Sequence, residues 1–220
     1  MNFSETLNED KNITRLIWFE DDLFNEYNIF YFKSNSICFN SYASDDVRLL
    51  SNHSACIIKA NGMTFNSVEQ IYHYMRFYRH SDVRETIMKM NNPNEIKNIC
   101  NRYFMDLHPD VKLQKEGFKQ NLLFYSQRLK IQQNPNVREV INKRLIRINN
   151  LEIIPQLVEY TWWNDTKNGT IDVDINNKGD FKNGEIKGQN RSGRQLRRAF
   201  IEYKKGLLNE EIKPPYDFVL

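Results

Sequence analysis

Apolar residues recur at helical spacing between residues 68 and 78, at the positions Val68, Ile71, Tyr72, Met75 and Tyr78. This periodicity predicts a helix with one face packed against a core. Ser67 directly precedes the pattern and predicts an N-cap, because its hydroxyl can accept unpaired amide hydrogens of the first turn. Glu69 falls in that turn, where the helix dipole favours a negative charge and packing partly removes the carboxylate from water.

Short segments rich in aromatic and branched residues predict strands earlier in the chain, at residues 13–19, 28–32 and 36–40. Ile57 and Ile58 then precede the pair Asn61 and Gly62. This dipeptide tolerates the positive φ angles of a tight turn, so we expect a β-hairpin immediately before the helix.

The middle of the chain has the pattern of several helices, divided at Asn-Pro and His-Pro pairs. Proline at a helix start is tolerated, because its missing amide hydrogen would have no partner there. The expected helices cover residues 81–90, 93–103 and 109–133, and a further one follows Pro135 with an apolar stripe that extends to Ile148. An extended segment at 152–161, a glycine-rich loop at 166–190 and a last helix at 192–207 complete the chain.

Together these elements predict an α+β fold that is mainly α-helical, with a small β element and N-terminal strands. A chain of 220 residues is long enough for one substantial core. We expect residues 1–10 to be a flexible lead-in, residues 11–210 to form a single domain and residues 211–220 to be a C-terminal tail.

Composition narrows the class of protein only a little. The net charge of +3 excludes neither nucleic acid nor a small anionic ligand as a partner, and an aromatic content of 13% argues against disorder. No apolar run approaches the roughly 20 residues of a membrane span, and the N-terminus lacks signal-peptide character. Three widely spaced cysteines suit free thiols in a reducing compartment, so a cytoplasmic location without a membrane partner is expected.

Cofactor motifs are not found. The histidines lack zinc-site spacing, which predicts no metal site; they are His53, His73, His80 and His108. The chain has neither a GxGxxG motif nor a P-loop lysine, and nothing places a cysteine at a helix N-terminus beside a base. We therefore expect no cofactor.

Two carboxylates, Glu69 and Asp165, lie at element ends beside aromatic residues. Cleavage of a bond between a sugar and a nitrogenous base passes through an oxocarbenium-like state, which a carboxylate can stabilise while it or another carboxylate activates water. The alternative for Glu69 is a carboxylate that only complements the helix dipole, and for Asp165 a turn residue.

The glycine-rich loop opens onto a helix whose first turns carry four arginines, Arg191, Arg194, Arg197 and Arg198. Backbone amides at a helix N-terminus and guanidinium groups both bind phosphate oxygens. A mobile loop and an exposed basic face are the alternative. Trp162, Trp163 or tyrosines of the 68–78 helix are candidates for stacking on a base, although aromatic residues at helical spacing more often belong to a core.

Several short motifs follow one another in order. They are Leu50-Ser51-Asn52, IIKANGMTF, Ser67-Val68-Glu69-Gln70-Ile71-Tyr72, Leu107-His108-Pro109-Asp110, LVEYT, NDTKNG and Gly188-Gln189-Asn190-Arg191-Ser192-Gly193. Taken together they resemble the NADAR family, the YbiA-like N-glycosidases, over roughly residues 37–207. Three positions depart from the family pattern, since Val111 and Asn168 replace tryptophans and Gln189 replaces a lysine.

This resemblance implies a mainly helical fold with a small β element, and hydrolysis of an N-glycosidic bond between a ribose phosphate and a nitrogenous base. It implies that Glu69 and Asp165 form the catalytic acidic pair. It also implies ligands for ribose and phosphate in Asn52 and in the motif that holds Gly188, Asn190 and Arg191. Tyr72 and Arg76, near Glu69 on its helix, and Trp163 are further candidate substrate contacts.

The leading hypothesis is removal of ADP-ribose from guanine in nucleic acid, in functional pairing with an ADP-ribosyltransferase. Lys and Arg on the middle and last helices favour a polymeric anionic substrate. One alternative is hydrolysis of phosphorylated riboflavin-pathway intermediates. Another is a sensor that binds NAD or ADP-ribose without turnover, which the missing tryptophans favour and the retained acidic positions oppose. A plain nucleic-acid-binding protein is a third alternative, although the chain has no recognised nucleic-acid-binding motif.

Overall fold

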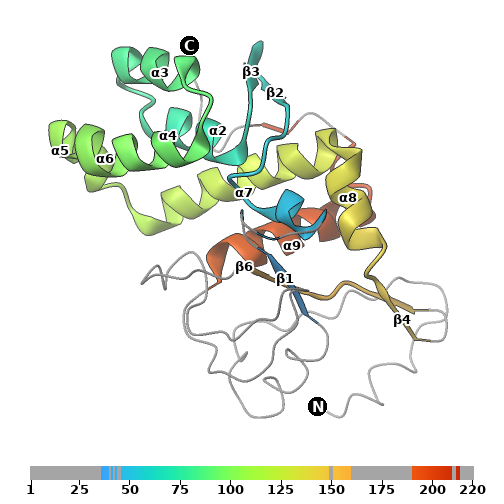
Figure 1. Ribbon diagram of the computed structural model, residues 1–220. Coiled ribbons are helices and arrows are strands. Elements are labelled where there is room, and N and C mark those ends of the chain that lie inside the picture. Colours follow the sequence, from blue (N-terminus) through green and yellow to red (C-terminus); the bar gives the residue numbers. More distant parts are fainter. Residues whose placement is uncertain are drawn as a thin grey trace, which may run out of the picture.

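The computed structural model describes residues 36–39, 41, 43, 46–148, 151–159, 190–209 and 212–213 (Figure 1). Within them the fold is α+β and mainly helical, as the sequence predicts. The strands expected at 13–19 and 28–32 lie outside the described residues, as do residues 166–189 of the glycine-rich loop. In the described part, no helix has the length and apolar character that crossing a membrane requires.

The long helix α7 (Glu116–Gln133) is the centre of the fold and contacts α2 (Val68–Arg76), α8 (Pro135–Asn142) and α9 (Arg191–Lys204). In Figure 1 it crosses the middle of the molecule, with α2 on one side and α9 on the other. The remaining helices are the 3-10 helix η1 (Asp46–Leu50), α3 (Ser81–Lys89), α4 (Pro93–Ile99), the π-helix η2 (Cys100–Phe104), α5 (Met105–Leu107) and α6 (Pro109–Lys112).

The strands form three pairs. β2 (Ile58–Ala60) and β3 (Met63–Phe65) are the expected hairpin, and both turn residues have positive φ, 49° at Asn61 and 74° at Gly62. β4 (Ile146–Ile148) pairs antiparallel with β5 (Leu151–Ile153). β1 (Ser36–Phe39), a strand predicted from the sequence, runs parallel to β6 (Gln156–Glu159) and so joins the start of the described chain to a strand far along the sequence.

The prediction of a single helix over residues 109–133 is wrong, because the helix is interrupted between α6 and α7. Arg76 accounts for the break: its Nη2 donates to the carbonyl oxygen of Val111 at 3.3 Å, and its Nε donates to Oε1 of Gln114 at 3.3 Å. The Nε2 of Gln114 in turn donates to the carbonyl oxygen of Arg76 at 2.6 Å. The same Val111 oxygen accepts the backbone amide of Gln114 at 3.3 Å, a three-residue bond in place of the four-residue bond of a continuous α-helix.

The helix expected to extend to Ile148 is also wrong. α8 ends at Asn142, and residues 146–148 form β4 instead. The apolar spacing through Leu145 and Ile148 suits a helix, but pairing with β5 satisfies the backbone groups in a different way. The last helix likewise ends at Lys204 and not at 207, since Gly206 adopts a φ of 74°.

Close approach of α9 to β6 places the start of that helix. Asn190 adopts a left-handed conformation with a φ of 44°. Its Nδ2 donates to the carbonyl oxygen of Leu157 at 2.8 Å, and its Oδ1 accepts from the backbone amide of Glu159 at 3.1 Å. At Gly193 an added Cβ would overlap the carbonyl oxygen of Leu157. Glycine is therefore required there by contact between two backbones.

We predict that Gly193→Ala destabilises the protein by about 1–3 kcal/mol, because the methyl group forces α9 away from β6. Urea unfolding monitored by circular dichroism measures this loss. Gly117→Ala in α7 is the matched control, since an added Cβ meets nothing within 4 Å there. The control should leave stability unchanged or raise it by up to about 1 kcal/mol. Equal stability of Gly193→Ala and the wild type would contradict the close packing.

Candidate active site around Glu69

Glu69 lies in the first turn of α2, as predicted, and the residue is 7% exposed. Ser67 is confirmed as the N-cap, because its Oγ accepts the backbone amide hydrogen of Gln70 at 3.1 Å. The amide of Glu69 itself donates to the carbonyl oxygen of Asn52 at 3.1 Å. The turn that holds Asn52 is thereby joined to the start of α2.

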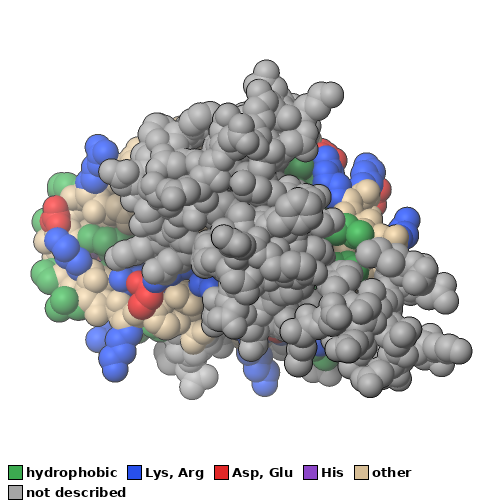
Figure 2. All heavy atoms as spheres, turned by 90° about the horizontal axis from the view of Figure 1, so that it is seen from below, with side chains coloured by type: hydrophobic (Ala, Val, Ile, Leu, Met, Phe, Trp, Pro, Cys, Tyr) green, Lys and Arg blue, Asp and Glu red, His purple; other side chains and the backbone are tan. Residues whose placement is uncertain are grey.

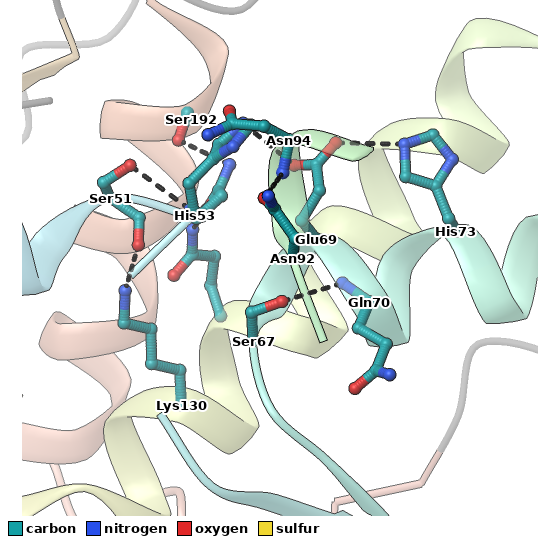
Figure 3. Close-up of polar contacts among 12 residues, drawn as sticks. Ser51, His53, Ser67, Glu69, Gln70, His73, Asn92, Asn94, Lys130 and Ser192 are labelled. Atoms are coloured by element: carbon teal, nitrogen blue, oxygen red, sulfur yellow. Dashed lines mark hydrogen bonds and ion pairs between the residues drawn. The ribbon is translucent and has the colours of Figure 1, made fainter. Parts of the chain in front are cut away.

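Two histidines approach the two oxygens of the Glu69 carboxylate (Figure 3). The Nε2 of His73, one helical turn further along α2, lies 3.0 Å from Oε1. The Nε2 of His53, from the segment between η1 and β2, lies 3.6 Å from Oε2. The carboxylate therefore lies between two imidazole rings, while its side chain keeps 10% of its surface exposed.

These contacts keep Glu69 ionised. Burial alone would raise its pKa, but the hydrogen bond from His73 and electrostatic interactions with His53, His73 and Lys97 lower that pKa from 4.5 to about 2. Burial lowers the pKa of His73 and outweighs the pull of Glu69 in the other direction. His73 is therefore neutral at neutral pH and donates its Nε2 hydrogen, which agrees with a buried Nδ1 that has no hydrogen-bond partner.

A buried lysine, Lys130 of α7, holds the turn that carries His53. Its Nζ donates to the carbonyl oxygens of Leu50 at 3.1 Å and Ser51 at 2.7 Å. Burial lowers the pKa of Lys130 from 10.5 to about 8. Lys130 thus gives the Leu50 carbonyl a donor at the end of η1. At Ser51 it shares the carbonyl oxygen with the backbone amide of Ser54, which donates at 3.2 Å.

Asn52 uses its side chain to join three elements. Its Oδ1 accepts from the Nε2 of Gln127 in α7, and its Nδ2 donates to the Oγ of Ser192 in α9 at 3.0 Å. Asn190 is similarly occupied by its two hydrogen bonds to β6. Both asparagines, predicted as ligands of ribose and phosphate, therefore have protein partners that position Glu69 and the start of α9.

Two of the predicted substrate contacts, Tyr72 and Arg191, are linked to Glu69 through electrostatic effects on Tyr72. Burial and the negative charges of Glu69 and Glu116 raise the pKa of Tyr72 to about 12, against the opposing charges of Arg76 and Arg191. Arg191 forms an ion pair with Glu116, and its side chain is 11% exposed. Arg76 stacks on Tyr72 with its guanidinium carbon 5.6 Å from the ring centre, although its hydrogen bonds lead to the break before α7.

The arginines further along α9 are not gathered at its N-terminus. Arg197 is buried and donates to the carbonyl oxygens of Ile154 and Pro155 before β6. Arg198 stacks on Phe124 with its guanidinium carbon 4.0 Å from the ring centre. The remaining predicted site residues, Asp165, Trp163 and Gly188, lie outside the described residues, as does Trp162.

Sequence reasoning missed five residues of this site: His53, His73, Gln127, Lys130 and Ser192. His73 had a usable signal, because a residue four positions after Glu69 on a helix shares its face. His53 directly follows the Ser51-Asn52 pair of the first sequence motif. Gln127 and Lys130 carried no signal, since polar residues in a long helix usually face water.

We predict that His73 is neutral in the folded protein, with hydrogen on Nε2 only, and two-bond proton–nitrogen NMR correlation reports this tautomer directly. The unfolded chain takes up its proton near pH 6.5 and the folded chain only at lower pH, so the stability that His73 contributes is lost as pH falls below 6.5. Glu69→Gln should lower the pKa of His73 further, because it removes the nearby anion. An imidazolium at pH 7 would contradict this account.

Comparison with known proteins identifies the fold. The structure is similar to the NMR structure of the E. coli protein YbiA, with a TM-score of 0.56 over 81% of this chain and 90% of that chain, at 21% sequence identity. No protein-family model matches the sequence, and no curated protein matches it. The chain therefore has a YbiA-like α+β fold, as the resemblance in sequence predicts.

Proposed function

We propose that this protein is an N-glycosidase that hydrolyses the bond between a ribose phosphate or ADP-ribose and a nitrogenous base. The observation that carries the proposal is the Glu69 carboxylate, which is buried, ionised and held between two imidazoles on a helix N-terminus. The YbiA-like fold and the order of the sequence motifs support the same class of reaction.

In this reaction the base leaves with the electrons of its bond to C1′, and the oxygen of water forms the new bond to that carbon. Positive charge develops on the ribose as the base departs and before the bond to water is complete. A fixed anion that is already desolvated stabilises that charge without reorganisation. With a pKa of about 2, Glu69 is a poor acceptor of a proton from water, so its role is electrostatic. Asp165 remains the candidate that activates water.

Arg191 is the candidate phosphate ligand. It is the first residue of α9, where amide groups and the helix dipole favour an anion, and its guanidinium now pairs with Glu116. A bound phosphate would replace the Glu116 carboxylate on Arg191. Tyr72, whose pKa is affected by both Glu69 and Arg191, is the candidate contact for the ribose.

The substrate that we favour is ADP-ribosyl-guanine in nucleic acid, made by an ADP-ribosyltransferase. This choice depends on the resemblance in sequence. On the face in Figure 2, Lys and Arg side chains of described residues stand apart from one another among other side chains. The experiment must therefore include both a polymer and a small phosphorylated substrate.

The test is release of ADP-ribose from ADP-ribosylated DNA by the wild type and by Glu69→Gln. The variant should lose at least about 100-fold in rate, because a neutral amide cannot balance the charge on the ribose. Glu95→Gln is the matched control, since Glu95 is an exposed carboxylate in the first turn of α4 and should be dispensable. Asp165→Ala tests the second carboxylate.

Further arms distinguish the substrates. Activity on a phosphorylated ribosylamine of the riboflavin pathway, without activity on DNA, would assign the enzyme to small-molecule metabolism. Binding of ADP-ribose without turnover of any substrate would identify a sensor. Full activity of a folded Glu69→Gln variant would overturn the proposed site.

A further inference from the structure

A second group of titratable side chains lies away from Glu69. Ligand atoms of His80, His108 and Asp110 all lie within 4.8 Å of one another. His80 immediately precedes α3, His108 immediately precedes α6, and Asp110 belongs to the first turn of α6. Spacing along the chain predicted no metal site, but the fold brings together residues as far as 30 positions apart.

The distances in this cluster match those around a small metal ion. The Nε2 of His80 lies 3.2 Å and 3.1 Å from the two carboxylate oxygens of Asp110. Nitrogen and oxygen ligands at 2.0–2.1 Å from a tetrahedral zinc ion would be about 3.3 Å apart. The ring centres of His80 and His108 are 3.9 Å apart, and a nitrogen of His108 lies within 4.8 Å of the ligand atoms of the other two residues.

Packing beneath the cluster fixes the rings. Phe77 is fully buried and meets both imidazoles edge-on, with ring centres 6.2 Å from His80 and 6.1 Å from His108. The outer side is open, since the Asp110 side chain is 49% exposed and that of His80 is 19% exposed. A hydrated ion can therefore reach ligands that are already oriented.

We propose that His80, His108 and Asp110 form a binding site for a divalent metal ion of the zinc class. Two imidazole nitrogens and one carboxylate suit Zn²⁺, Co²⁺ or Ni²⁺, whereas Mg²⁺ and Ca²⁺ prefer sites made of oxygen ligands alone. Three protein ligands leave the remaining positions to water. Binding requires the imidazoles to lose their protons, so affinity falls in acid.

The ion would serve the fold and not the bond cleavage. Phe77 and Glu69 are eight positions apart, about 12 Å along the axis of α2. An ion at the His80 end would connect the segment after α2 to the start of α6, next to the break that Arg76 fixes. An ion that binds the folded state and not the unfolded state raises the free energy of unfolding by mass action.

The test uses the untagged full-length protein, treated with a chelator and then titrated with ZnCl₂ in a calorimeter. We expect one equivalent to bind and the melting temperature to rise. Co²⁺ should give the visible absorption of a tetrahedral site with nitrogen and oxygen ligands. His108→Gln and Asp110→Asn should each weaken zinc binding at least about tenfold.

Two controls make the test specific. Asp106→Asn removes a neighbouring exposed carboxylate that pairs with Lys112 at 3.3 Å, and zinc affinity should be retained. Glu69→Gln removes the carboxylate between the other two histidines and should also leave zinc affinity unchanged. Zinc binding that survives both His108→Gln and Asp110→Asn, or that is lost in Glu69→Gln, would overturn the proposal, as would no binding by the wild type.

Discussion

An ionised carboxylate that is largely withdrawn from water is costly unless it has close polar partners, and this constraint organises the site around Glu69. The N-terminus of α2 and two imidazoles supply those partners. One histidine belongs to the same helix as Glu69, and the other follows a turn that is bonded to α7 and α9. Charge, fold and proposed chemistry thus depend on one small group of contacts.

Three parts of the chain that are distant in sequence meet at Asn52. The amide group of this residue connects Gln127 of α7 with Ser192 of α9, and its carbonyl oxygen accepts from Glu69. The start of α9 is fixed independently, because Asn190 bonds to β6 and Gly193 allows the two backbones to approach. The scaffold therefore holds Arg191 in place relative to Glu69 without using either of their side chains.

Local signals in the sequence were sufficient for the elements around Glu69. The Asn61 and Gly62 turn, the Ser67 cap and the first-turn carboxylate each depend on neighbouring residues, and all three are confirmed. The predictions are wrong where a residue distant in sequence determines the end of a helix or the burial of a side chain. Arg76 donates to the carbonyl oxygen of Val111 at the end of α6, and the periodicity between 109 and 133 could not indicate this contact. From its sequence context Lys130 is likewise expected at the surface, but in the fold it is buried and donates to two carbonyl oxygens at the end of η1.

The most direct test of this account is the ionisation of Glu69, followed by carbon-13 NMR of its side-chain carboxyl as pH is lowered from 7 through the folded range. Glu69→Gln assigns the signal. The account predicts that the carboxyl stays ionised well below its ordinary pKa of 4.5, toward 2, and that His73→Leu moves the midpoint upward because burial then dominates. A wild-type midpoint at or above 4.5 would contradict a fixed anion and, with it, the proposed role of Glu69 in catalysis.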